Sequence, residues 1–171
     1  MAGQFDLAVE EATRAIAIEP NQDWVYATRG VAYKQLGKFD LAIADLTRAI
    51  ELDPKYLWAI AQRAETYRMA QDFDLAIADS TRALGLNSAL AWVYGTRAGA
   101  FAGKGFIEEA LADSDQALRI DPKYAFALGV KGWALMALGR KPEAVEFITK
   151  ALSLDPSLSY LKDLLKEAAQ S

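Results

Sequence analysis

The chain has 171 residues, of which 53% are apolar and 25% charged, a composition typical of a globular protein that can bury a core. It contains neither Cys nor His, which excludes disulfides, a thiolate nucleophile and any imidazole base or metal ligand. The net charge of −4 argues against nucleic-acid binding, since that function needs a basic surface.

The sequence also gives no sign of a targeting or membrane segment. Its first residues, MAGQFDLAVEE, are acidic and lack the apolar run of a secretory signal. The most apolar stretch, residues 125–139, is short and carries Lys131. We therefore expect no membrane span, no cofactor or metal and no enzymatic activity, and a cytoplasmic location.

The dominant pattern is a repeat with a period of 34 residues. Two alanine positions recur in five registers, and a proline position and a glycine position recur in four. The alanines are Ala8, Ala42, Ala76, Ala110 and Ala144, then Ala15, Ala49, Ala83, Ala117 and Ala151. The others are Pro20, Pro54, Pro122 and Pro156, with Ser88 in the gap, and Gly3, Gly37, Gly105 and Gly139, with Gln71 in the gap.

Each repeat is predicted to form two helices, because apolar residues recur at spacings of three and four on both sides of the glycine turn. In chain order we expect the second helix of a partial repeat at 4–19, within residues 1–22, and full repeats at 23–56, 57–90, 91–124 and 125–158. In the first full repeat the helices should span about 24–36 and 40–51. The residue before each proline is restricted to extended conformations, which ends the second helix.

The last segment, residues 159–171, is predicted to be a capping helix. Its leucines should face inward, and its charged residues should face solvent, as the end of a repeat stack requires. The inward set is Leu158, Leu161, Leu164 and Leu165, and the outward set is Lys162, Asp163, Lys166 and Glu167. We find no linker, so the chain is interpreted as one array. The sequence starts in mid-repeat, and the motif FDLA recurs at Phe5, Phe39 and Phe73. These two features are typical of a fragment of a longer array, of recent duplication or of a designed scaffold.

These residues resemble the signature of the tetratricopeptide repeat family, over nearly the whole chain. In the first full repeat the family's positions fall on Tyr26, Gly30, Tyr33, Ala42, Ala49 and Pro54. The next repeat departs from the pattern at Asn87-Ser88, where Asp-Pro is expected. The resemblance implies an all-α fold, a right-handed solenoid of stacked helical hairpins with a concave surface lined by the first helix of each repeat.

A row of arginines, Arg29, Arg63 and Arg97, also follows the period, and each has an aspartate 16 residues later, at Asp45, Asp79 and Asp113. These charges could face a ligand, or each guanidinium could bind the carboxylate of the partner helix. We favour the second interpretation, because the last full repeat changes both residues together, to Lys131 and Phe147.

The concave surface implied by the resemblance is the candidate binding site for a protein or peptide. Counting along the first helices predicts an aromatic ladder with small residues beneath it. The predicted groove comprises Trp24, Ala27, Val31, Lys34, Trp58, Ala61, Glu65, Arg68, Trp92, Gly95, Gly99, Phe126, Gly129, Trp133 and Met136. Any one of these aromatic side chains could instead pack against the next repeat. Because several of them recur at the same position of successive repeats, we favour a surface that contacts a partner.

The family's carboxylate clamp, which holds acidic chaperone tails, looks absent, because Ala27, Val31, Gln62 and Trp92 occupy the positions of its Lys and Asn. We therefore expect an apolar partner, either an extended peptide or an amphipathic helix, with Lys34 and Arg68 available to its acidic residues.

Three functional classes remain open at this stage. The leading one is an adaptor that binds another protein in the groove. The second is self-association, possible if Ala8, Ala12, Ala15 and Ile16 leave an apolar edge on the partial repeat for a second copy to cover. The third, RNA binding, is disfavoured by the acidic charge and the few basic groove residues.

Overall fold

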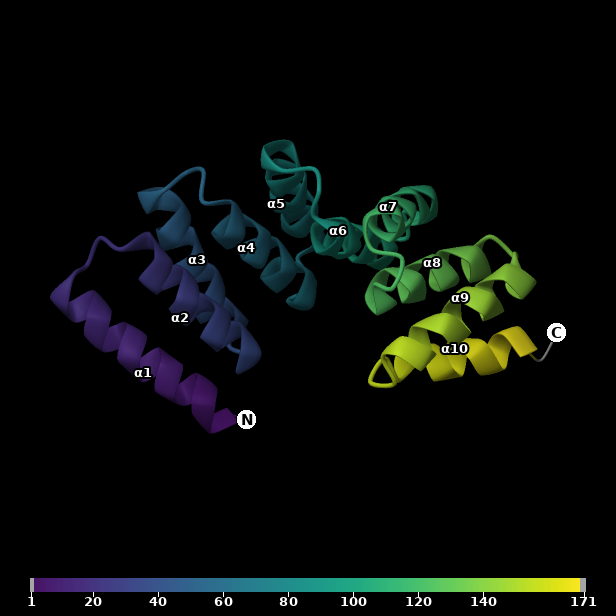
Figure 1. Ribbon diagram of the computed structural model, residues 1–171, viewed down its shortest axis with the longest axis horizontal. Coiled ribbons are helices and arrows are strands. Elements are labelled where there is room, and N and C mark those ends of the chain that lie inside the picture. The colour runs from purple at the N-terminus through teal and green to yellow at the C-terminus, as the bar shows by residue number, and fades with distance from the viewer. Residues whose placement is uncertain (1, 170–171) are drawn as a thin grey trace. The chain divides into compact units, whose positions relative to one another are not determined.

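The computed structural model describes residues 2–169, which contain ten α-helices and no strand (Figure 1). Glycine or another left-handed residue separates the two helices of a repeat, and an extended residue ends the second. The helices are α1 (Ala2–Ile18), α2 (Asp23–Gln35), α3 (Phe39–Leu52), α4 (Leu57–Met69), α5 (Phe73–Leu86), α6 (Ala91–Lys104), α7 (Ile107–Ile120), α8 (Ala125–Ala137), α9 (Lys141–Leu154) and α10 (Tyr160–Ala169).

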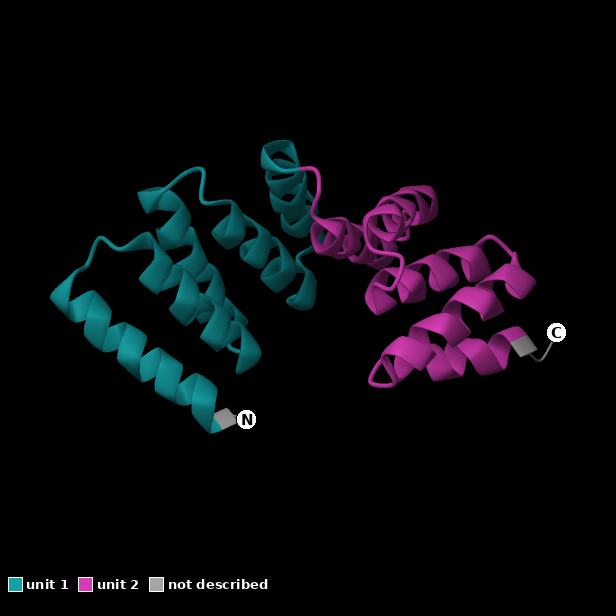
Figure 2. Ribbon diagram, viewed as in Figure 1, with its two compact units in different colours: residues 1–87 teal, residues 88–171 magenta. Residues whose placement is uncertain are grey.

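These helices fall into two compact units, residues 1–87 and 88–171 (Figure 2). In unit 1, α2 pairs with α3 and α4 with α5, while α1 packs against α2 and α3 against α4. In unit 2, α6 pairs with α7 and α8 with α9, α7 packs against α8, and α10 covers α9 and α8. We call α2, α4, α6, α8 and α10 first helices and α1, α3, α5, α7 and α9 second helices. That the repeats form one continuous array stays a prediction.

The turn inside each hairpin needs a left-handed residue. Gly37, Gly105 and Gly139 have φ values of 71°, 76° and 73°, a region that costs glycine nothing. Gln71 has the same conformation, with a φ of 66°, and is the one non-glycine residue in the described chain with a positive φ. The interrupted glycine position therefore keeps the turn and bears the strain of a side chain there.

The Asp-Pro pairs end the second helices in a defined way. Asp53, Asp121 and Asp155 are extended, and one carboxylate oxygen of each accepts a hydrogen bond of 2.9 Å from the backbone N–H two residues later. This local bond stabilises the turn that leads into the next repeat, because the short acidic side chain imitates a backbone turn.

Small residues allow close contact between the helices of one repeat. A Cβ placed on Gly30 would lie 2.9 Å from Cγ of Leu46, and one on Gly132 would lie 2.5 Å from Cγ1 of Ile148. The two middle repeats carry Ala in the first helix and Ser in the second at the same positions, and all are fully buried. These pairs are Ala64 with Ser80 and Ala98 with Ser114. Glycine thus faces a large side chain and alanine faces a small one, so a bulkier residue on the second helix is offset by a smaller residue on the first.

Partly buried ion pairs connect the helices, as the second interpretation of the arginine row predicted. Arg29 donates bonds of 2.7 and 2.8 Å to Asp45 in α3, and one of 3.0 Å to Oγ1 of Thr13 in α1. Arg63 joins α4 to Asp79 in α5 and to Thr47 in α3 in the same way. The hydrogen bond to Asp45 raises the pKa of the Arg29 guanidinium, which is charged at every relevant pH.

The last full repeat replaces this arrangement by another. The ammonium of Lys131 donates a bond of 2.6 Å to Asp115 in α7, and it lies 4.2 Å from the ring centroid of Phe147 in α9. Asp115 stands at the position of Thr13 and Thr47. The carboxylate has therefore moved from the helix that follows the cation to the helix that precedes it, and an aromatic face covers the other side.

The end of unit 2 is closed by α10, as predicted. Leu161 is fully buried in a cluster with Leu128, Leu135 and Ile148. Leu158, Leu164 and Leu165 pack against the same cluster, and the predicted outward residues Lys162, Asp163, Lys166 and Glu167 are exposed. The helix thus presents apolar residues to the core and charged residues to water.

We expect Gly30→Ala to lower the free energy of unfolding by about 1–3 kcal/mol, because the added methyl would overlap Leu46. In a Leu46→Ala background the same change should be neutral or stabilise by up to about 1 kcal/mol, since alanine forms helices better than glycine. Urea denaturation followed by circular dichroism measures both. Equal costs in the two backgrounds would contradict the packing described here.

Asp79→Ala should lower the free energy of unfolding by about 3 kcal/mol, because it leaves the largely desolvated guanidinium of Arg63, only 15% exposed, without its carboxylate. Glu51→Ala, which removes the exposed partner of Arg48, is the matched control and should cost less than about 1 kcal/mol. Thermal melting curves compare the two variants, and similar losses would show that the buried pair has no special role.

Candidate functional site

The predicted aromatic ladder is not buried in the core. Trp24 and Trp58 are 56% and 39% exposed, and Trp92 and Phe126 are half-buried. In two repeats a tyrosine two positions earlier in the chain helps to orient this aromatic ring. The ring centroids of Tyr56 and Trp58 lie 6.1 Å apart, and those of Tyr124 and Phe126 lie 6.2 Å apart. Each first helix therefore begins with an aromatic side chain that water can reach.

In unit 1 the surface between α2 and α4 is polar. The ammonium of Lys34, which is largely buried, donates a bond of 2.6 Å to Oε1 of Gln62. Burial lowers the pKa of Lys34, nearby Glu65 acts in the opposite direction, and Arg68 lowers it further. Arg68 binds Glu65 in a bidentate pair, with distances of 2.9 and 2.7 Å.

These contacts correct one expectation. Lys34 and Arg68 were predicted to be available to acidic residues of a partner, but each is already engaged within unit 1. Gln62, which accepts the hydrogen bond of Lys34, was not among the predicted groove residues. The signal for it was the spacing of 28 residues, which places both side chains between adjacent first helices.

The equivalent surface in unit 2 is a pocket of about 250 Å³, with four apolar and two charged residues in its lining. Its lining combines α8, the start of α9 and α10. The residues are Trp133, Met136, Ala137, Lys141, Leu164 and Glu167. Met136 and Leu164 stand at the positions that Lys34 and Gln62 occupy in unit 1, so the same part of the repeat is polar in one unit and apolar in the other. Trp133 and Met136 belong to the predicted groove, whereas Leu164 was predicted only to face the core.

Four small residues of the predicted groove offer no surface to a ligand. Ala27 and Ala61 are buried. A Cβ on Gly95 would lie 2.4 Å from Cε1 of Tyr124, and one on Gly129 would lie 2.9 Å from Cδ1 of Leu161. These four small residues instead allow the next part of the chain to pack closely. The predicted groove residues that can still contact a ligand are therefore the remaining ones, of which Val31 and Gly99 are half-buried.

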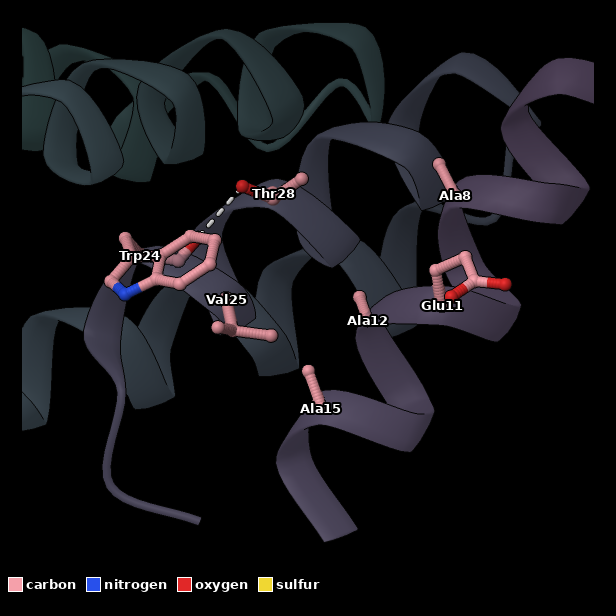
Figure 3. Close-up of a pocket in the computed structure, with 7 residues that line it drawn as sticks. All are labelled: Ala8, Glu11, Ala12, Ala15, Trp24, Val25 and Thr28. Atoms are coloured by element: carbon pink, nitrogen blue, oxygen red, sulfur yellow. Dashed lines mark hydrogen bonds between the residues drawn. The ribbon is translucent and has the colours of Figure 1, made fainter. Parts of the chain in front are cut away.

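A second pocket, of about 370 Å³, lies between α1 and α2 (Figure 3). Its lining is Ala8, Glu11, Ala12, Ala15, Trp24, Val25 and Thr28. Of the edge predicted for self-association, Ala12 is buried and Ala8, Ala15 and Ile16 are half-buried, because this side of α1 faces α2. The exposed large apolar residues of α1 are instead Leu7 and Ile18.

No cluster of three or more acidic side chains in residues 2–169 could hold a metal ion. No helix in that range is long and apolar enough to cross a bilayer.

Comparison with known proteins agrees with this architecture. The sequence model described as "Tetratricopeptide repeat" matches residues 24–56, and a second model of that description matches residues 125–158. The crystal structure of MamA is 24% identical and covers 92% of each chain, with a TM-score of 0.78. A MamA chain from Desulfovibrio magneticus RS-1 is 19% identical and covers 91% of this chain and 88% of that one, with a TM-score of 0.80.

A third structure is that of YrrB, described as a TPR protein with an unusual peptide-binding site. It is 18% identical, with a TM-score of 0.75, and the match covers 96% of this chain and 84% of that one. A comparison with curated protein sequences found no match. At these identities the structural likeness concerns the fold. Together with the two matched repeats it leads to one conclusion: the chain belongs to the tetratricopeptide repeat proteins, all-α helical solenoids that generally act as scaffolds for protein–protein interaction.

Proposed function

We propose that this protein is an adaptor that binds an apolar extended peptide or an amphipathic helix on the open faces of its first helices. The observation that carries the proposal is the exposure of Trp24 and Trp58, at the start of α2 and α4. Large aromatic side chains are frequent anchors at interfaces, because they bury much area with little loss of conformational entropy.

The two units offer different chemistry to such a partner. In unit 1, Trp24 and Trp58 flank a surface whose charged groups, Lys34, Glu65 and Arg68, already have partners in the chain. A ligand on this surface would gain binding free energy by covering apolar area and by accepting or donating hydrogen bonds at the edges of these charged pairs. In unit 2, Trp133 and Met136 line a pocket that an aliphatic or aromatic side chain would fill, and the flexible thioether adapts to its shape.

The predicted absence of a carboxylate clamp is consistent with this partner. Lys34 is largely buried and donates its hydrogen bond to Gln62, so it is poorly placed to attract an acidic tail. Peptide binding is also what the name of the YrrB structure reports for that protein. We therefore infer an apolar ligand rather than an acidic one.

Self-association remains a second candidate, because α1 exposes Ile18 (79%) and Leu7 (56%) to water. Large apolar side chains that are exposed on one helix favour contact with another molecule.

A peptide selected from a displayed library against the intact protein tests the adaptor proposal. We expect Trp58→Ala to weaken its binding by about 2 kcal/mol, or about thirtyfold, as for a true anchor. Leu75→Ala, on the second helix α5 and similarly exposed, is the control and should change the affinity less than about twofold. Isothermal titration gives the affinities, and melting curves show whether each variant is folded. If folded Trp58→Ala, Trp24→Ala and Met136→Ala variants all kept full affinity, the first-helix faces would not be the site.

Self-association predicts a concentration-dependent molar mass in light scattering. The double change Leu7→Asp and Ile18→Asp should abolish it without lowering the melting temperature, because both side chains are exposed. Leu41→Asp with Leu75→Asp, on second helices elsewhere in unit 1, supplies the matched control. A wild-type protein that stays monomeric up to about millimolar concentration, far above the Kd of specific associations, would remove this candidate.

A further inference from the structure

The second helices α3 and α5 expose the same apolar residues near their starts. Leu41 and Leu75 are 49% and 50% exposed, and Ala44 and Ala78, three positions later on the same side of each helix, are exposed as well. Both helices pack against α4, so these equivalent positions of successive repeats lie on one side of unit 1. We call the surface formed by these four residues the outer face of unit 1.

Neighbouring helices do not cover this repeat position. α3 packs against both α2 and α4, and α1 packs on the other side of α2, yet Leu41 remains exposed. Leu7, at the same position of α1, is 56% exposed, a value close to those of Leu41 and Leu75. The exposure of the leucine is therefore a property of the position itself, and it persists where helices are present on both sides.

The fold does not require an apolar residue at this position. In unit 2 the position of Leu41 is held by Glu109 in α7 and by Glu143 in α9, and both glutamates are exposed. These two helices pair with α6 and α8 as α3 and α5 pair with α2 and α4. A single exposed leucine is ordinary, but a position that is apolar in every second helix of unit 1 and acidic in those of unit 2 indicates a contact surface.

The charge beside the outer face is negative. Asp40 and Asp74 directly precede the two leucines, and both are exposed. The one basic residue of each helix lies about 10 Å further along the helix axis and binds another group of the chain. Arg48 donates a bond of 3.0 Å to Glu51, and Arg82 donates one to a backbone carbonyl.

The first-turn position of these aspartates also stabilises their own helices, because the N-terminus of a helix carries partial positive charge. That charge is only about half an elementary charge, so each carboxylate still presents net negative charge to a partner. In the turns before the two helices, Lys38 and Asp72 have opposite charges and compensate each other. A molecule that covers the outer face therefore meets an acidic edge.

Backbone chemistry indicates that the partner is a helix. The outer face belongs to two helices, whose backbone N–H and C=O groups are paired inside each helix. An extended peptide would bring unpaired backbone groups to a surface that offers them no partners, whereas a helix satisfies its own. A second copy of this chain is disfavoured, because its net charge of −4 would be repelled by the acidic edge.

We propose that the outer face of unit 1 docks an amphipathic helix of another protein, with lysine or arginine along one flank of its apolar stripe. The stripe would cover the four apolar side chains, and the basic flank would pair with Asp40 and Asp74. This site lies on second helices, whereas the adaptor proposal concerns the first-helix faces, so the two sites are separate.

The probe is a fluorescent peptide made of three LKQLKAQ heptads. As a helix it carries leucines along one stripe and lysines along one flank of that stripe. A hydrocarbon link on the side away from the leucines keeps it helical, since isolated helices of this length are marginal in water. Fluorescence anisotropy with the full chain should show saturable binding.

Leu41→Asp with Leu75→Asp should weaken this binding by about tenfold or more, because each new carboxylate would lose water against the apolar stripe. Ile120→Asp with Leu154→Asp makes the same charge change at similarly exposed residues on second helices of unit 2, and it should weaken binding by less than about threefold. Melting curves report whether each variant is folded.

Asp40→Lys with Asp74→Lys tests the charge. The variant should bind the probe about tenfold more weakly, and it should bind a second peptide, with glutamate in place of every lysine, better than the wild type does. Glu108→Lys with Glu109→Lys changes two first-turn carboxylates of α7 in unit 2 and is the matched control. It should leave the wild-type preference for the lysine peptide in place.

Trp58→Ala separates this site from the adaptor site, and it should leave the affinity for the lysine peptide unchanged. If Trp58→Ala weakens the peptide and the Leu41 and Leu75 variant does not, the peptide binds on the first helices, which overturns this proposal and leaves the adaptor proposal intact. The absence of saturable binding, equal effects of the two Asp double variants, or no exchange of peptide preference would also overturn it. So would a dimer of the chain that the Leu41 and Leu75 variant dissociates, because the occupant would then be a second copy.

Discussion

The structure depends on one contact, where the two helices of each repeat approach closely enough that a single methyl group matters. Gly30 faces Leu46 and Gly132 faces Ile148, and in the two repeats between them alanine faces serine. Protein interiors are densely packed, so a larger side chain on one helix requires a smaller one on the helix that faces it. Each repeat satisfies this constraint with a different pair of residues, and the recurring alanines of the second helices keep the neighbouring contacts equally close.

Close packing also determines how the charges are arranged. A guanidinium between three helices has lost most of its water, and its planar group is satisfied by the carboxylate of one helix and a threonine hydroxyl of another. Where Lys131 replaces arginine, Asp115 supplies the carboxylate from the opposite side and Phe147 covers the remaining face. Relative to the other repeats, three residues that are distant in sequence differ together in this one. This is expected if leaving a buried charge without a partner lowers the stability of the fold.

With both contacts satisfied inside the hairpins, one face of the first helices is left open to solvent. That face carries Trp24 and Trp58 in unit 1 and Trp133 and Met136 in unit 2. The same repeat position holds a buried lysine with Gln62 in unit 1 and methionine with Leu164 in unit 2. A regular backbone thus presents two different chemical surfaces, and this difference, rather than the fold, is the basis of any selectivity for a partner.

The sequence by itself determined the all-α class, the helix pairs, the turns and the capping helix, because the 34-residue period and the spacing of apolar residues are local properties of the chain. It also indicated that the arginines bind aspartates, since Lys131 and Phe147 differ together. Only the tertiary structure decided which groove residues reach water. Gly95 and Gly129 looked like a groove floor, but Tyr124 and Leu161 fill the space above them, and Lys34 and Arg68 looked available but are held by Gln62 and Glu65. The physical reason is that a small side chain opens space equally well for a ligand or for the next helix, and which of the two fills it depends on residues about 30 positions away.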